Sequence, residues 1–352
     1  MPLKERLKKL KEIKILIIRL KPVGDTVLIS AVFRNLKKMF PQCVIDIVVY
    51  PSAREAIGAN PYINKVLVLK RNNLSKLAFY FKLLFSTYHI TIDYINNPTS
   101  SAITLFAKAG VRIGKDISRN FFYNYRFKLN KILYSAQKSL YPLKFLGLRN
   151  FNDFMPEFYV IDKDRKQAQD ILKKAGIKKN DRMVGIFVSA KYPVRQYRAE
   201  HFARLASMIK KDFSSTRVLF LFGKDDRESI LKIKKKLQPG KYFILISDGI
   251  SIGVMAGIIS HLNYFLTNDT GPKHLATALK IPTLTVFGAT TEKSWNPPDT
   301  GRYATIRKRL NCAPCNKLEC RLEGQTLRCV NDLAPEDIYK KLKVLLKKYL
   351  CR

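Results

Sequence analysis

The fold of this chain is decided by the stretch Phe265-Leu-Thr-Asn-Asp-Thr-Gly-Pro-Lys-His-Leu-Ala-Thr-Ala-Leu-Lys-Ile-Pro-Thr-Leu-Thr-Val-Phe-Gly288. A short apolar run opens the stretch, and Thr270 and Pro272 suit the start of a helix. Apolar residues then recur at helical spacing, and residues 283–287 are typical of a buried strand. Strand, tight turn, helix and strand in this order predict a βαβ unit.

The turn before the predicted helix has the properties of an anion site. Backbone N–H groups and the positive end of the helix dipole point at whatever lies above the strand ends. Gly271 has no Cβ to block a close approach, and Lys273 and His274 add donors. A diphosphate fits this arrangement. From the pattern alone, an ordinary capped βα turn is the favoured interpretation, because such turns are common.

Length and composition predict two domains with real cores. The chain has 352 residues, of which 47% are apolar, which excludes global disorder. Its 65 Lys and Arg against 27 Asp and Glu give a formal net charge of +38. Such a charge predicts anionic partners, namely nucleic acid, a membrane surface or a phosphorylated substrate.

The N-terminal segment is basic but lacks the long apolar core of a signal peptide, and no apolar run reaches membrane-spanning length. We therefore expect a cytoplasmic protein. Leu3, Leu7 and Leu10 lie on one face of a possible amphipathic helix. That helix either docks on anionic lipid or packs on its own domain.

Strand and helix patterns alternate along the chain in two series. The first starts with the Ile-rich run 13–20 and the second with residues 183–188, and the polar segment 176–181 separates them. This doubled alternation predicts α/β architecture with two open, mostly parallel sheets. A basic helix over residues 335–350 ends the chain.

Two motifs resemble those of glycosyltransferase family 9, the ADP-heptose:lipopolysaccharide heptosyltransferases. One is Asp269-Thr-Gly-Pro-Lys-His274 with the following helix and strand, and the other is Ile15-Leu-Ile-Ile-Arg-Leu-Lys-Pro-Val-Gly-Asp-Thr-Val-Leu28. The resemblance implies the GT-B type, in which two doubly wound Rossmann-like domains face a cleft. It implies an acceptor domain over residues 1–163, a nucleotide-sugar domain over 164–334, and a helix over 335–352 that packs back toward the first domain.

Sugar transfer needs a base for the acceptor hydroxyl and positive charge for the departing diphosphate. The resemblance makes Asp25 the base; the alternative is that Asp25 caps the following helix. Arg195 stands where family members have a lysine, with Tyr197 in the place of a tryptophan, and Asp226, with Asp225 in reserve, is expected at the ribose. The predicted donor-binding residues are Arg195, Asp226, Asp269, Thr270, Gly271, Lys273, His274, Gly288 and Thr290, and the predicted acceptor-binding residues are Lys21, Gly24 and Arg126. No convincing Asp-x-Asp motif is present, so catalysis is expected to need no metal.

A local cluster of cysteines comprises Cys312, Cys315, Cys320 and Cys329. The spacing allows a structural zinc site or two disulfides, and a reducing cytoplasm disfavours the disulfides. In either case we expect a stapled loop over residues 312–329 with no catalytic role.

Together these features predict an inverting transferase that moves heptose from ADP-heptose to the lipid A–Kdo inner core. It would act as a peripheral protein on the inner face of the cytoplasmic membrane, without nucleic acid as a partner. The alternatives are another sugar-nucleotide donor or acceptor, a non-catalytic glycan-binding relative, or a basic nucleic-acid-binding protein with a zinc module.

Overall fold

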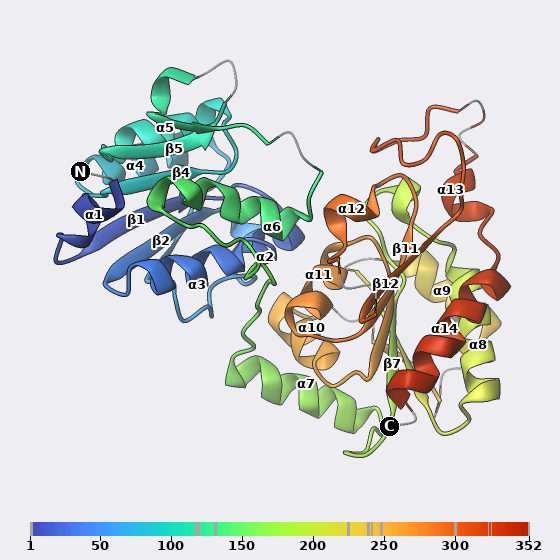
Figure 1. Ribbon diagram of the computed structural model, residues 1–352. Helices are drawn as coiled ribbons and strands as arrows, with labels where there is room; N and C mark the ends of the chain where they lie inside the picture. Colours follow the sequence, from blue (N-terminus) through green and yellow to red (C-terminus); the bar gives the residue numbers. More distant parts are fainter. Residues whose placement is uncertain are drawn as a thin grey trace. The chain divides into compact units, whose positions relative to one another are not determined.

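The computed structural model describes residues 3–116, 120–129, 132–223, 226–237, 240, 242–246, 249–298, 301–322, 324 and 326–350. The chain forms two compact units, residues 1–159 and 160–352, and each is built on its own six-stranded parallel sheet (Figure 1). The two doubly wound sheets expected from the alternation are confirmed. The sequence analysis placed the domain boundary after residue 163, within the first turn of helix α7 (Asp162–Lys174).

The sheet of the first unit has the strand order β3-β2-β1-β4-β5-β6, which is the Rossmann order. Five of the six residues of β1 are buried, as expected for a central parallel strand covered on both faces. The strands are β1 (Ile13–Ile18), β2 (Cys43–Val49), β3 (Lys65–Val68), β4 (Ile90–Asp93), β5 (Val111–Lys115) and β6 (Tyr125–Phe127).

The helices of the first unit include a short N-terminal one whose apolar side is covered. Leu7 is buried in the core of this unit, and Leu3 and Leu10 pack against that core. Of the two interpretations of this segment, the structure therefore supports packing on its own domain. The helices are α1 (Leu3–Lys8), α2 (Val23–Val27), α3 (Ser30–Met39), η1 (Pro51–Ala53), α4 (Asn73–Leu84), α5 (Pro98–Phe106), η2 (Asn120–Phe122), α6 (Ser135–Leu140) and η3 (Tyr141–Leu146).

The sheet of the second unit has the order β12-β11-β10-β7-β8-β9, which repeats the Rossmann order when its strands are counted from β7. Its edge strand β12 was not expected from the sequence, although it pairs in parallel with β11 along its whole length. The strands are β7 (Met183–Phe187), β8 (Arg217–Leu221), β9 (Phe243–Ile246), β10 (Tyr264–Asn268), β11 (Thr283–Phe287) and β12 (Tyr303–Arg307).

The last helix, α14, belongs to the second unit. Its buried residues Ile338, Leu342 and Leu346 lie in that unit's core, and α14 packs beside α8 (Figure 1). Its apolar face is thus used within its own unit, and packing toward the first domain stays a prediction. The remaining helices are η4 (Pro193–Arg195), α8 (Ala199–Asp212), α9 (Arg227–Lys236), α10 (Ile252–Ile259), α11 (Gly271–Ala278), α12 (Glu292–Trp295), α13 (Arg328–Asn331) and α14 (Pro335–Leu350).

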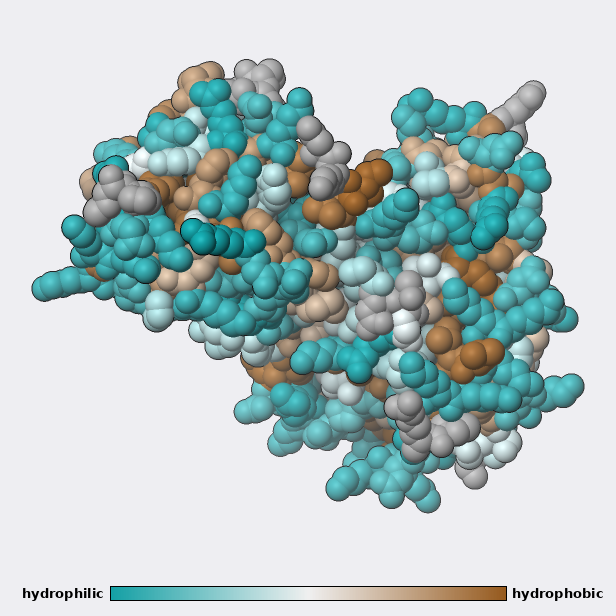
Figure 2. Space-filling view, in the orientation of Figure 1, coloured by the Kyte–Doolittle hydropathy of each residue, from teal (hydrophilic) through white to brown (hydrophobic). Residues whose placement is uncertain are grey.

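The surface reflects the basic composition. Most of the face in Figure 2 is hydrophilic, with small hydrophobic groups between the polar side chains. Across the described part of the chain, no helix combines the length and the apolar character that a membrane span requires.

Candidate active site

The carboxylate of Asp25 lies just beyond the carboxyl end of β1, in the short helix α2. The Arg19 guanidinium donates to this carboxylate at 3.0 Å and to the Asp25 backbone carbonyl at 3.1 and 3.2 Å. The N-cap residue of α2 is Pro22, and Asp25 is inside the first turn. Asp25 therefore does not occupy the capping position, and its orientation is set by Arg19.

Asp25 lines a cavity of about 460 Å³, which is within the usual size range of small-molecule sites. The cavity is strongly cationic: its lining includes Arg19, Lys21, Lys115, Lys128 and Lys138. Burial lowers the pKa of Lys115, and the nearby charges of Arg19 and Lys21 lower it further. A cavity with this charge suits an anionic ligand beside the candidate base.

The three predicted acceptor-binding residues have different positions. Lys21 lines the cavity, and Gly24 is buried in α2 beside Asp25. Arg126 is exposed and donates to the Tyr123 carbonyl at 3.2 Å, and it is not among the lining residues. Its neighbour on β6, Phe127, lines the cavity instead, because successive side chains of a strand point to opposite faces.

Three further lysines of the cavity are not among the predicted site residues: Lys115, Lys128 and Lys138. Lys115 ends β5, Lys128 follows β6 and Lys138 lies in α6. Lys115 could have been found, because it follows a predicted strand and ligands bind at the carboxyl ends of parallel strands. The other two come to the cavity only through the fold.

In the second unit, Asp269 follows β10 and is buried with Lys273. The two side chains form an ion pair at 2.8 Å, Thr290 donates to the other carboxylate oxygen at 2.7 Å, and Lys273 also donates to the Trp295 carbonyl at 2.5 Å. Burial raises the pKa of Asp269, but the charge of Lys273 and the hydrogen bonds outweigh it and the net shift is downward. These three predicted residues are thus engaged with one another, and they hold the loop that carries Thr270 and Gly271.

Two polar atoms beside this loop are buried without a partner in the described residues: Nδ1 of His274 and Nε of Arg195. Burial lowers the pKa of His274 well below its usual value, and the charges of Lys273 and Arg195 add to this effect. His274 is therefore neutral at pH 7. Since buried polar groups are normally satisfied, these atoms point to a ligand at the N-terminus of α11.

The segment that carries Arg195 is fixed by Tyr197. The Tyr197 backbone N–H donates to the Asn268 side chain at 3.0 Å, and its buried hydroxyl donates to the Leu333 carbonyl at 2.9 Å. Gly288 lies against the same segment, and a Cβ there would overlap the Val194 carbonyl oxygen. Packing therefore requires a glycine at position 288.

Asp226 is the N-cap of α9. One carboxylate oxygen accepts from the Ser229 backbone N–H at 3.3 Å, and the other accepts from the Ser189 hydroxyl, which in turn accepts from the Gly223 backbone N–H. Asp226 lies beyond the carboxyl end of β8, where the ribose prediction requires it. The alternative residue, Asp225, lies outside the described residues.

The four clustered cysteines are free thiols; Cys312 and Cys315 are exposed, and Cys320 and Cys329 are half-buried. Burial raises the pKa of Cys329, and the other three thiols nearby raise it further. The sulfurs are therefore neighbours. As they stand, however, no group of three or more His, Cys, Asp or Glu among the described residues could hold a metal ion.

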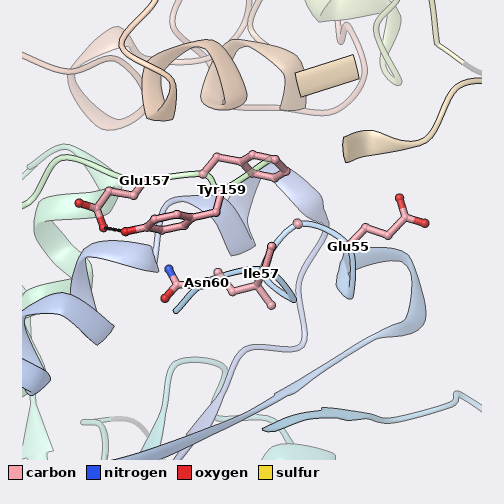
Figure 3. Close-up of a pocket in the computed structure, with 8 residues that line it drawn as sticks. Glu55, Ile57, Asn60, Glu157 and Tyr159 are labelled. Atoms are coloured by element: carbon pink, nitrogen blue, oxygen red, sulfur yellow. Dashed lines mark hydrogen bonds between the residues drawn. The ribbon is translucent and has the colours of Figure 1, made fainter. Parts of the chain in front are cut away.

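A second recess in the first unit is shown in Figure 3. Glu157 and Tyr159 form one side, joined by a hydrogen bond of 3.0 Å, and Glu55, Ile57 and Asn60 form the other. It leaves no space that a water molecule could occupy. It is therefore not a ligand site.

The fold and site define a glycosyltransferase of the GT-B class: two Rossmann-type units, one with a carboxylate in a cationic cavity and one in which α11 begins beside the unpartnered His274 Nδ1 and Arg195 Nε. Residues 77–326 match the model of "Glycosyltransferase family 9 (heptosyltransferase)". The chain belongs to this family, as the two sequence motifs indicated, and this membership argues against the nucleic-acid-binding alternative.

Comparisons with individual relatives support the family assignment. The lipooligosaccharide heptosyltransferase 2 of Campylobacter jejuni is 25% identical over 92% of this chain and 96% of its own length. A glycosyltransferase family 9 structure from Veillonella parvula superposes with a TM-score of 0.82 at 19% identity, covering 95% of this chain and 97% of that chain. The E. coli ADP-heptose lipopolysaccharide heptosyltransferase II gives 0.77 at 20% identity, covering 96% and 99%. These two structural similarities show a shared fold only.

Proposed function

We propose that this enzyme transfers heptose from ADP-heptose to the lipid A–Kdo inner core, with inversion at the anomeric carbon. The observation that carries the proposal is Asp25, held by Arg19 at the edge of a cationic cavity. The names of the relatives from C. jejuni and E. coli support the heptose donor and the lipopolysaccharide-type acceptor.

In the proposed reaction, Asp25 takes the proton from the acceptor hydroxyl as its oxygen attacks the anomeric carbon. The new C–O bond forms as the bond from that carbon to the diphosphate oxygen breaks, and the electron pair leaves with ADP. The N-terminus of α11 and Arg195 supply positive charge to the departing diphosphate, so no metal is required. Asp226 is proposed to accept from the ribose hydroxyls.

The acceptor would be held by charge. Lys21, Lys115 and Lys138 line the cavity that contains the base, and they would pair with acceptor phosphates and Kdo carboxylates. Because this acceptor is a lipid, the enzyme is proposed to work as a peripheral protein at the inner face of the cytoplasmic membrane.

The four-cysteine loop is proposed to be structural, crosslinked either by zinc or by disulfides. Metal analysis of the purified protein, together with a thiol count, distinguishes the two crosslinks. Zinc binding requires the sulfurs to come closer together than they lie here.

The function is tested by incubating the protein with ADP-heptose and a lipid A–Kdo acceptor and measuring released ADP and glycosylated product. A thermal-shift screen of ADP, UDP, GDP and CMP tests the nucleotide, because a ligand that binds the native state raises its melting temperature. We expect ADP to give the largest shift. If another nucleotide gives a larger shift, the proposed donor is wrong. The residue that we would then expect to change the nucleotide preference is Arg195, which stands in place of a lysine.

A further inference from the structure

Helix α4 of the first unit presents an apolar face to solvent. Leu74, Leu77 and Phe81, together with Phe85 at its C-cap, have exposed fractions of 80%, 66%, 62% and 78%. Their spacing of three, four and four residues places them on one side of the helix, and the rings of Phe81 and Phe85 lie 5.2 Å apart. We call these four residues the α4 apolar face.

The opposite side of α4 is already packed. Leu83 is buried, Phe79 and Tyr80 pack against the core, and Tyr80 stacks on Phe106 of α5 at 5.2 Å. A helix that is apolar all round is normally covered on all sides, whereas the fold covers only one side of α4. Exposed apolar surface of this kind marks an interaction site.

The surroundings of the α4 apolar face are cationic. Residues 56–92 contain no Asp or Glu, but they contain Lys65, Lys70, Arg71, Lys76 and Lys82. Beside the helix lies a cavity of about 550 Å³, to which Phe79 and Phe85 give an apolar wall and Lys14, Arg54, Lys65 and Lys82 give positive charge. The carboxylate that lines this cavity, Asp46, accepts a hydrogen bond from the Tyr88 hydroxyl at 2.8 Å.

We propose that the α4 apolar face docks this enzyme on the surface of an anionic lipid bilayer. Leu and Phe side chains would enter the boundary between headgroups and acyl chains, and the flanking Lys and Arg would meet the anionic headgroups. A net charge of +38 favours such a surface over a protein partner of ordinary charge. The inference rests on the proposed function, because it supplies the membrane contact that a lipid acceptor requires.

The test is sedimentation of the full chain with phosphatidylcholine vesicles, with and without phosphatidylglycerol. The Leu74→Ser/Phe81→Ser variant should bind anionic vesicles about tenfold or more weakly. Each replacement removes the favourable free energy of moving an apolar side chain from water into the bilayer interface. The matched control is Leu231→Ser/Val344→Ser, which removes two exposed apolar side chains, 59% and 69% exposed, from helices of the second unit. Its vesicle binding should equal that of the unmodified chain, and unchanged melting temperatures would show that both variants fold.

Undiminished vesicle binding by the α4 variant would overturn the proposal. So would a dimer in solution that the same variant abolishes, because the face would then be covered by a second copy. Transfer of heptose to a soluble acceptor fragment is measured in parallel. Transfer without vesicle binding would overturn the docking surface alone, whereas vesicle binding without transfer would overturn the proposed function alone.

Discussion

The Arg19 guanidinium holds Asp25 at two points, donating to its backbone carbonyl at 3.1 Å and to its carboxylate at 3.0 Å. Burial lowers the pKa of Arg19, while the charge of Asp25 raises it, and an arginine remains protonated under these conditions. One side chain therefore fixes both the position of α2 and the direction of the candidate base. Sequence analysis noted Arg19 only as part of the motif.

Replacing Asp25 by Asn should reduce turnover by roughly 10²–10⁴-fold, because the amide keeps the size of the side chain but cannot accept the proton. ADP affinity should hardly change, since the predicted donor site belongs to the other unit. Steady-state kinetics and calorimetry with ADP provide the measurements. Asp116→Asn, which removes a carboxylate from the same cavity, is the control. An Asp25→Asn variant with most of its activity would exclude Asp25 as the base.

Replacing Arg19 by Lys should lower kcat by about 10²-fold, the cost of a misplaced reacting group. Lysine keeps the charge but lacks the planar fork that reaches both acceptors on Asp25. ADP affinity should remain unchanged. Arg34→Lys provides the control, because Arg34 holds Asp153 and Glu157 at another place in the same unit. Equal kcat values for the two variants would argue against a positioning role for Arg19.

Replacing Gly271 by Val should weaken ADP binding, because its side chain would enter the space above the α11 N-terminus where the diphosphate is proposed to lie. The melting temperature without nucleotide and the ADP-induced shift are compared. Gly110→Val is the control, since an added Cβ at Gly110 meets no heavy atom within 4 Å. Unaltered ADP binding by Gly271→Val would remove the nucleotide from this helix.

Replacing Lys273 by Met should destabilise the fold by about 3–5 kcal/mol, because it leaves Asp269 buried without its cation. Adding Asp269→Asn in the same chain should recover part of this loss. Lys232→Met, which removes a surface pair with Glu228, should cost no more than about 1 kcal/mol. Chemical denaturation measures all three. A Lys273→Met cost as small as that of the surface variant would show that the pair is not coupled to folding.

Stability should fall as the pH drops below 6.5, the ordinary pKa of histidine. The pKa of folded His274 lies well below that value, so between the two pKa values the unfolded chain binds a proton that the folded chain does not. The contribution of neutral His274 is therefore complete above pH 6.5 and is lost toward the folded pKa. His274→Gln should flatten the curve of unfolding free energy against pH. An unaltered slope would contradict burial of this imidazole.

The sequence alone predicted those structural elements that are formed by residues close together in the chain. The apolar strands and the βα turns with Gly24-Asp25 and Thr270-Gly271 were predicted because neighbouring residues form them. Edge strand β12 was missed because three of its five residues are only half-buried, so its pattern lacks the fully apolar run of a central strand. The cationic cavity was missed in part because Lys128 and Lys138 meet Asp25 only through the fold. Arg126, which does not line this cavity, was chosen over Phe127 because three residues are too few to show which side chains of β6 point inward.

The hydroxyl of Tyr197 links the Arg195 segment to Leu333, two residues before the last helix begins. The residue that accepts from Tyr197 therefore lies directly before the C-terminal helix and shares its core. Shortening the chain past Leu333 would remove the acceptor of the Tyr197 hydroxyl, and the Arg195 segment would lose one of its contacts. The proposed donor site would then depend on a final sixteen-residue helix that shares a core with Leu333.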